Sequence, residues 1–200
     1  MVEKFLEGGA WMWPILFIFI IGFVFVIERI YFLMKGLNSS KDIFINEAMS
    51  TYKSQGADQA KDLCGQAVGP VANLLHSGFN KAKDGRDEAE KSMDLTASVE
   101  MSSLENNMTW ISLCIATAPM LGFLGTVVGM IAAFKEIKLQ DDISPAVVAG
   151  GIEVALLTTA FGLIVAVILQ ILQNIVLYII DNQIVTMQKS SAQALEIIKK

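Results

Sequence analysis

A single carboxylate, Glu153, stands near the start of an almost unbroken apolar stretch that covers residues 146–180. Small and hydroxyl-bearing residues follow it in the same stretch: Ala155, Thr158, Thr159, Gly162 and Ala166. A charge at the centre of a membrane helix costs about 2.5–3.5 kcal/mol on insertion scales, so such groups usually face a protein interior or a wet pathway. A threonine hydroxyl can donate and accept hydrogen bonds without carrying a charge. The pattern therefore predicts an ion path.

A second apolar segment carries a similar set of small residues. Its members are spaced by three or four positions and so share one helix face: Gly122, Gly125, Thr126, Gly129 and Ala133. The later stretch has a matching stripe, which comprises Ala155, Thr159, Gly162, Ala166, Gln170 and Asn174. Low-bulk surfaces let two membrane helices approach closely. Two interpretations stay open: the stripes only pack helices, with each hydroxyl bonded to a carbonyl of the preceding turn, or they also line a conduit.

The composition of the chain indicates that lipid is part of its solvent. The chain has 200 residues, of which 54% are hydrophobic, and its mean hydropathy is +0.53. A membrane-spanning helix needs about 20 apolar residues, and three segments are long enough: 13–34, 108–134 and 146–180. The first apolar run ends at Glu28 and Arg29 without a small-residue cleavage site, so we interpret it as a retained helix rather than a signal peptide. The predicted fold class is an all-α membrane protein with three transmembrane helices.

The distribution of lysine and arginine predicts the orientation. Most basic residues lie between the first two spans or after the third, and these regions should be cytoplasmic. The N-terminus is then outside and the C-terminus inside. The remaining segments follow: an outer N-terminal segment 1–12, a cytoplasmic helical domain 35–107, an outer loop 135–145 and a cytoplasmic C-terminal helix 181–200. Within the cytoplasmic domain, Gly56, Gly69 and Gly85 should separate helices, and residues 87–107 should lead into the second span without a break.

Several functional classes find no support in the residues. Cys64 and Cys114 are lone thiols in different environments and suggest neither a disulfide framework nor a metal site. His76 has no metal partners spaced around it. We find no nucleophile with a base, no metal cluster and no phosphate loop, so the sequence predicts neither an enzyme nor a cofactor. The net charge of −5 lies mostly in a segment of alternating basic and acidic residues, which gives no support for nucleic-acid binding.

Longer motifs resemble the MotA/TolQ/ExbB proton channel family, and most closely its three-span ExbB/TolQ branch. The motifs that carry the resemblance occur in order along nearly the whole chain: Gly8–Gly9, Met12–Leu16, Ile27–Arg29, Ala118–Val127 and Ala155–Leu163. The last two motifs are the specific ones. A lone glycine-rich apolar helix would be weak evidence for the family. An ordered set of motifs at matching membrane depths is strong evidence for it.

The resemblance implies an assembly and a function. Members form homopentamers in the bacterial inner membrane, and their second and third spans line a central pore. A dimer of a single-span partner resembling ExbD or TolR sits in this pore and carries an aspartate in its own helix. The positions of Thr126 and Thr159 face that partner. Proton flow moves the partner within the ring, and the work passes to a transducer such as TonB or TolA.

Glu153 departs from the family pattern. Counted back from the motif 158–163, the family glutamate falls at Val154, one residue later. One residue rotates a helical side chain by about 100°, although Gly150 and Gly151 could loosen the helix and restore the placement. We place Thr126, Thr158, Thr159 and Glu153 on the proton pathway, with a subunit-interface or surface carboxylate as the alternative for Glu153.

The expected function is an ExbB-like stator that uses the proton motive force to energise TonB-dependent outer-membrane transport. A TolQ-like stator for envelope integrity and cell division is the alternative within the class. A membrane scaffold that conducts no ions is the alternative outside it. Sodium would need several oxygen ligands, so the sparse hydroxyl stripe favours protons.

Overall fold

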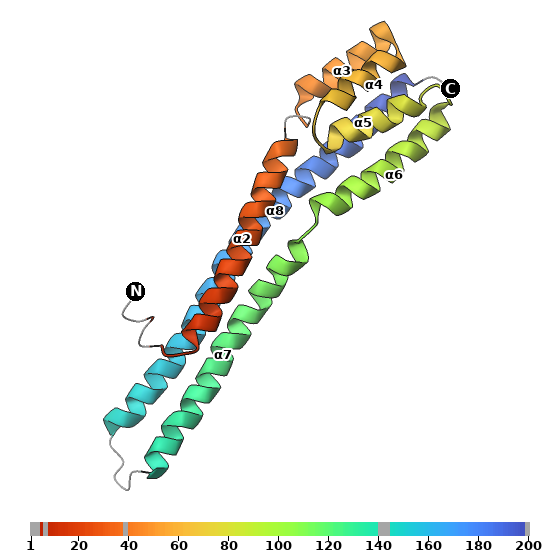
Figure 1. Cartoon of the computed structure of the whole chain (residues 1–200). Coiled ribbons are helices and arrows are strands. Elements are labelled where there is room, and N and C mark those ends of the chain that lie inside the picture. The colour runs from red at the N-terminus through yellow and green to blue at the C-terminus, as the bar shows by residue number, and fades with distance from the viewer. Residues whose placement is uncertain (1–4, 6–7, 38–39, 140–144, 199–200) are drawn as a thin grey trace. The chain divides into compact units, whose positions relative to one another are not determined.

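The computed structural model describes residues 5, 8–37, 40–139 and 145–198, and every regular element within them is an α-helix (Figure 1). The helices are α2 (Met12–Gly36), α3 (Asp42–Gln55), α4 (Ala57–Gln66), α5 (Pro70–Lys81), α6 (Arg86–Leu104), α7 (Met108–Leu139) and α8 (Pro145–Ile197). Parts of four predicted segments lie outside the described residues: 1–4 and 6–7 of the N-terminal segment, 38–39 of the cytoplasmic domain, 140–144 of the outer loop, and 199–200 of the C-terminal helix.

Three of the helices are long and apolar enough to cross a membrane, namely α2, α7 and α8. This confirms the predicted all-α class with three apolar helices. Helix α8 has 53 residues, which corresponds to about 80 Å at the usual rise per residue. Because a bilayer core is only about 30 Å thick, a large part of α8 extends beyond it, and its sequence becomes polar from Asp181 onward.

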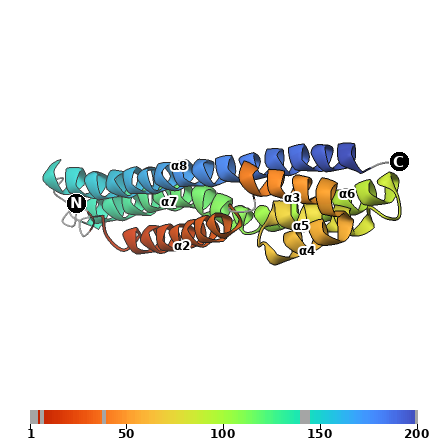
Figure 2. The same ribbon diagram turned by 90° about the horizontal axis from the view of Figure 1, so that it is seen from above.

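The chain divides into two compact units. The first comprises residues 1–27 and 107–174, and the second comprises 28–106 and 175–200, so α2 and α8 each contribute to both. In the first unit, α2, α7 and α8 run side by side (Figures 1 and 2). They enclose a core of five buried residues: Ile15, Cys114, Ala118, Val165 and Leu169. Gly22 permits this packing, because a Cβ atom there would lie 2.8 Å from Leu169 Cδ1.

The second unit packs short helices around an apolar core of its own. Its buried side chains include Val71, Leu74, Leu75, Phe79 and Met93. The ring of Phe79 stacks on Tyr52 of α3, with centroids 4.9 Å apart. Gly56 and Gly69 have φ angles of 91° and 145°, values that favour glycine, and they separate helices where the sequence predicted breaks.

The predicted continuous path from residue 87 into the second span is wrong. Helix α6 ends at Leu104, and α7 begins only at Met108. Asn107 between them has a φ of 62°. Asparagine adopts this left-handed conformation more readily than most residues, and it interrupts the helix.

Arg29 stabilises the end of α6. Its side chain is buried, and Nη1 donates a hydrogen bond of 3.2 Å to the carbonyl oxygen of Ser103. The same guanidinium forms two hydrogen bonds with the carboxylate of Glu28, at 2.6 and 2.8 Å, and lies 4.8 Å from the centre of the Phe32 ring. The last carbonyls of a helix have no partner within it and carry partial negative charge, so a cation there is favourable.

Cys64 gives a test of the packing of the second unit. Its thiol is almost fully buried, and burial raises its pKa from 9.0 to about 12. Because the thiolate is the reactive species, we expect iodoacetamide at pH 8.5 to modify native Cys64 at least about a hundredfold more slowly than an exposed cysteine. Peptide mass spectrometry measures this rate, and a cysteine introduced by Ser50→Cys on the exposed face of α3 is the control.

Urea should remove the difference between the two thiols. Burial makes the pKa of Cys64 higher in the folded protein than in the unfolded protein. The stability that its neutral thiol contributes is therefore complete at pH values below the unfolded-state pKa, and it is lost as the pH rises toward the folded-state pKa. The unit should therefore need less urea to unfold at pH 10 than at pH 8. Equal alkylation rates for both thiols in the native protein would contradict the packing described here.

Candidate functional site

Helices α7 and α8 meet along a seam where glycine brings the two backbones together. A Cβ atom added at Gly162 would lie 2.6 Å from the carbonyl oxygen of Ala118. One added at Gly122 would lie 2.9 Å from the carbonyl oxygen of Thr158. Real Cβ atoms do not approach backbone so closely. The seam therefore depends on the absence of side chains at these positions.

The other small residues predicted for a packing face lie along the same seam or beside it. A Cβ atom at Gly129 would be 3.1 Å from that of Ala155, and one at Gly125 would be 2.8 Å from Thr158 Oγ1. Ala133 is buried and lies close to Gly151 of α8. Ala166 packs, partly buried, against the apolar core of the unit. The two stripes identified in the sequence thus face each other within one chain.

Three threonine hydroxyls meet two backbone carbonyls in the middle of the seam. Thr126 Oγ1 donates to the carbonyl oxygen of Ala155 on the opposite helix, at 2.8 Å. Thr159 Oγ1 donates in the other direction, to the carbonyl oxygen of Gly122, at 3.1 Å. The two hydroxyls are also within hydrogen-bond reach of each other, so their two hydrogens fill two of these three contacts at a time. Gly122 lies four residues before Thr126 on α7, and Ala155 lies four residues before Thr159 on α8. Each threonine thus bonds to the carbonyl one turn before the other threonine, so the arrangement is reciprocal.

This geometry separates the two interpretations of the threonines. Thr158 is buried and follows the packing interpretation, because its hydroxyl donates to Ala155 in its own preceding turn at 2.7 Å. For Thr126 the bond within its own helix, to Gly122, is 3.3 Å and is longer than the bond across the seam. Thr126 and Thr159 therefore connect the helices, and each remains partly exposed.

Thr126 and Thr159 lie on the side of the seam away from the N-terminal residues. The ring of Phe161 packs on Phe5, with centroids 5.6 Å apart. Thr159 precedes Phe161 by two residues, a rotation of about 200°, and so points the opposite way. On α7, a Cβ atom at Gly125 would lie 3.2 Å from Trp11 Cβ, whereas Thr126 is turned by about 100° from Gly125.

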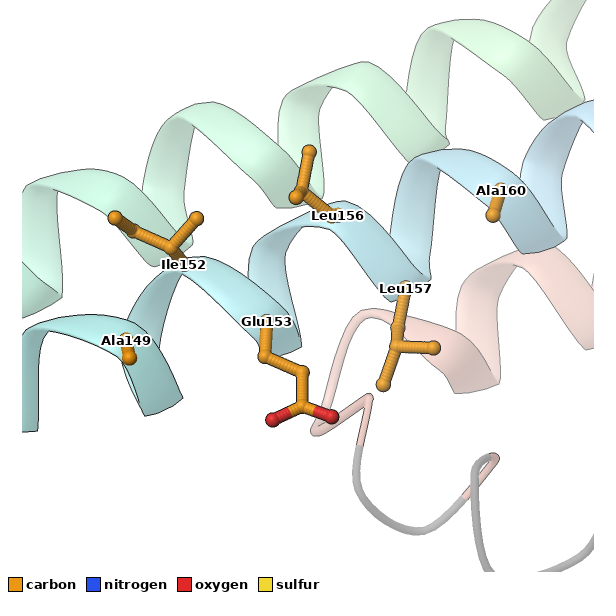
Figure 3. A pocket seen from close by; sticks show the side chains of 6 residues that line it. All are labelled: Ala149, Ile152, Glu153, Leu156, Leu157 and Ala160. Atoms are coloured by element: carbon orange, nitrogen blue, oxygen red, sulfur yellow. The ribbon is translucent and has the colours of Figure 1, made fainter. Parts of the chain in front are cut away.

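Glu153 points away from α7, as Figure 3 shows. It lies between Gly151 and Ala155, which both contact α7, and two residues on a helix correspond to about 200°. Its carboxylate is exposed beside an open apolar hollow of about 550 Å³. The other residues that line this hollow are Ala149, Ile152, Leu156, Leu157 and Ala160.

The structure does not bring Glu153 together with the threonines of its own chain. Gly150 and Gly151 are both helical, so they do not return the carboxylate to the face expected for the family glutamate. Val154, the position where that glutamate falls, faces the N-terminal segment, since a Cβ atom at Gly9 would lie 3.8 Å from Val154 Cγ1. Among the described residues, no group of three or more histidines, cysteines or carboxylates is arranged to hold a metal ion.

One polar contact of the seam was missed by the sequence analysis. Gln170 and Asn174 were predicted to extend the stripe of α8, but both are exposed and bond to each other at 3.3 Å. Gln173 instead is buried, and its Nε2 donates to Ser112 Oγ of α7 at 2.6 Å. The three-and-four spacing was the only signal available, and it fits more than one face of a long helix.

Comparison with known proteins agrees with this geometry. Residues 66–189 match the MotA/TolQ/ExbB proton channel family. An ExbB homolog of Methanothermobacter thermautotrophicus, named as a biopolymer transport protein, is 33% identical over 199 residues, which cover 100% of this chain and 68% of the relative. This chain belongs to the MotA/TolQ/ExbB proton channel family. As a member, it is a multi-pass membrane protein of the proton-channel, biopolymer-transport type.

Other relatives in the family are more distant or match over a shorter length. The biopolymer transport protein ExbB-like 3 of Synechocystis sp. is 24% identical over 190 residues, which cover 94% of this chain and 90% of that protein. The Tol-Pal system protein TolQ of Haemophilus influenzae is 34% identical over 77 residues, which cover 38% of this chain and 34% of that protein. ExbB-type and TolQ-type proteins are thus both similar to this chain.

The seam predicts that only one of two glycine-to-alanine changes in α8 lowers stability. Gly162→Ala places a methyl group against the backbone of α7, and we expect it to destabilise the first unit by about 1–3 kcal/mol. Gly150→Ala is the matched control, because nothing lies within 4 Å of its added methyl group. Thermal unfolding of the purified protein in detergent measures both. A Gly162→Ala variant as stable as the control would contradict the close approach of the helices.

Proposed function

We propose that Thr126 and Thr159 form part of a proton pathway between α7 and α8, and that the chain is the stator of a proton-driven motor. The observation that carries the proposal is the reciprocal bonding of the two hydroxyls across the seam. Both residues are partly exposed. They can therefore exchange hydrogen bonds with water or with a carboxylate of a partner.

The hydroxyl pair suits the passage of a proton because its hydrogen bonds can reverse. Thr126 can donate to Ala155 while it accepts from Thr159, or it can donate to Thr159 while Thr159 donates to Gly122. Both arrangements leave the hydroxyls neutral and hydrogen-bonded. The protonatable group itself would come from elsewhere, which avoids the cost of a permanent charge in hydrocarbon.

The protonatable group, in this proposal, is an aspartate of a single-span partner resembling ExbD or TolR. A dimer of that partner would occupy a central pore lined by α7 and α8 of five copies of the chain in the inner membrane, with the N-terminus outside and the C-terminus inside. The neutral aspartate could face apolar walls, and the charged form would favour the threonines. The work would pass to a TonB-like transducer and energise outer-membrane transport.

Glu153 has a secondary role in this proposal. It lies on the face of α8 opposite Gly151 and Ala155, so it would act at the outer mouth of the path or at a contact between subunits. No other acidic or basic residue lines its hollow among the described residues.

The two positions should differ in their effect on proton flux. Thr159→Val keeps the shape of the side chain and removes its hydroxyl, so we expect partner-dependent proton flux in liposomes to fall about tenfold, equivalent to about 1.4 kcal/mol in the barrier. Glu153→Gln should lower the flux less. The flux assay uses the chain co-purified with the products of its neighbouring genes. Equal losses in the two variants would contradict this ranking.

A non-conducting scaffold makes a different prediction for the same seam. Thr126→Ala and Thr159→Ala would then change thermal stability without changing partner-dependent flux. A lower flux in variants that keep the unfolding temperature of the parent protein would favour the pathway. An ExbB-like and a TolQ-like stator share this outcome, and the identity of the co-purified transducer, TonB-like or TolA-like, distinguishes them.

A further inference from the structure

Glu153 places a charge on an apolar surface of α8. Its side chain is exposed and forms no ion pair with any described residue. The hollow of about 550 Å³ beside it is otherwise lined by apolar side chains, and Leu156 among them is 59% exposed. A charge in apolar surroundings is costly unless another polar or charged group accompanies it. This face of α8 therefore fits a partner that brings apolar cover together with a positive charge.

Helix α7 carries positive charge on the face that points away from α8, near the loop end where α7 stops and α8 begins. Ala133 of α7 lies against Gly151 of α8. Lys135 and Lys138 follow Ala133 by two and five residues, which correspond to rotations of about 200° and 140°. Both lysines are exposed, and neither forms an ion pair with a described residue. They are therefore free to meet a carboxylate of another chain.

Two phenylalanines of α7 supply the apolar cover. Phe123 and Phe134 are 64% and 59% exposed. They are 11 residues apart, which is close to three helical turns, so they share a face. Lys138 follows Phe134 by four residues and lies on that face too. In the hollow of α8, Ala149 and Ala160 have the same separation of 11 residues, and their small side chains leave room for aromatic rings.

The rings and the alanines also lie at the same depth. The two helices are antiparallel, and the contact of Ala133 with Gly151 fixes their register. Copies of the chain in one membrane share the same orientation and depth, so this register also holds between neighbouring copies. Each phenylalanine is then level with one alanine to within one residue, Phe134 with Ala149 and Phe123 with Ala160.

The charged groups lean toward each other in this register. Glu153 is level with Ile131, so the two lysines start about 6 and 10 Å nearer the loop end. Helical side chains lean toward the N-terminus of their own helix. Because α8 begins at the loop end, the carboxylate leans toward that end. Because α7 ends there, Lys135 and Lys138 lean back toward the carboxylate.

We propose that α7 of a second copy of this chain covers the hollow beside Glu153. The two phenylalanines of that copy lie over the two alanines, and its two lysines pair with the carboxylate. The faces that meet are different surfaces of the chain, so the contact is heterologous, and its repetition around an axis along the membrane normal closes a ring. The inference rests on the part of the proposed function in which copies of the chain form a ring, and it names the residues that join them.

Cysteine cross-linking tests the register of this contact. Two differently tagged versions of the full chain are co-expressed, one with Phe134→Cys and one with Ala149→Cys, and the membranes are oxidised with copper phenanthroline. A dimer that carries both tags should form, and Phe123→Cys should pair with Ala160→Cys in the same way. The matched controls exchange the partners, which separates the thiols by about 16 Å in depth. Equal yields from matched and exchanged pairs, or no dimer from either matched pair, would overturn the proposal.

Charge reversal tests the ion pair. Glu153→Lys replaces attraction by repulsion, so the yield of the cross-link between positions 134 and 149 should fall about tenfold. Adding Lys135→Glu and Lys138→Glu to the same chain should restore it. Glu153→Gln keeps the shape and removes only the charge, so its loss should be smaller. An undiminished yield in Glu153→Lys, or no recovery in the triple variant, would mean that the lysines do not pair with this carboxylate.

The outcome for this contact is distinguishable from the outcome for the proton pathway. If the matched pairs cross-link in a protein that shows no partner-dependent proton flux, the contact is correct and the pathway is wrong. If the parent protein conducts protons and its matched pairs do not cross-link, the pathway is correct and the contact is wrong.

Discussion

The direct approach of the backbones of α7 and α8 is the constraint on which the rest of the first unit depends. In hydrocarbon the hydrophobic effect does not draw helices together, so packing and hydrogen bonds must do so. Gly122 and Gly162 leave no side chain between the two helices. The carbonyl oxygens of Gly122 and Ala155 are therefore within reach of hydroxyls on the opposite helix.

That approach also determines what the threonines can do. On an isolated helix, a threonine hydroxyl usually bonds to its own preceding turn. Here Thr126 and Thr159 bond across the seam and to each other. The result is a neutral polar patch on an apolar surface, and it suits a pathway whose charge is supplied by a partner. Glu153 faces another direction and is not needed to complete the patch.

The second unit contains the positions where the apolar runs of α2 and α8 stop, so polar groups there need partners. Arg29 supplies a cation to the last carbonyls of α6 and is itself neutralised by Glu28. Gln183 donates one hydrogen bond, to the carbonyl oxygen of Leu33, and its Oε1 has no partner among the described residues.

The sequence by itself determined the all-α class, the three apolar helices, the two small-residue faces and the family. The class, the helices and the faces depend on local composition and residue spacing, which are visible without the fold. The family was indicated by the resemblance of ordered motifs along the chain. Only the tertiary structure decided that Thr159 bonds to Gly122, that Gln173 rather than Gln170 meets α7, and that Glu153 faces away. Spacing defines which residues share a face, but the rotation of each helix against its neighbours depends on contacts between residues far apart in the chain.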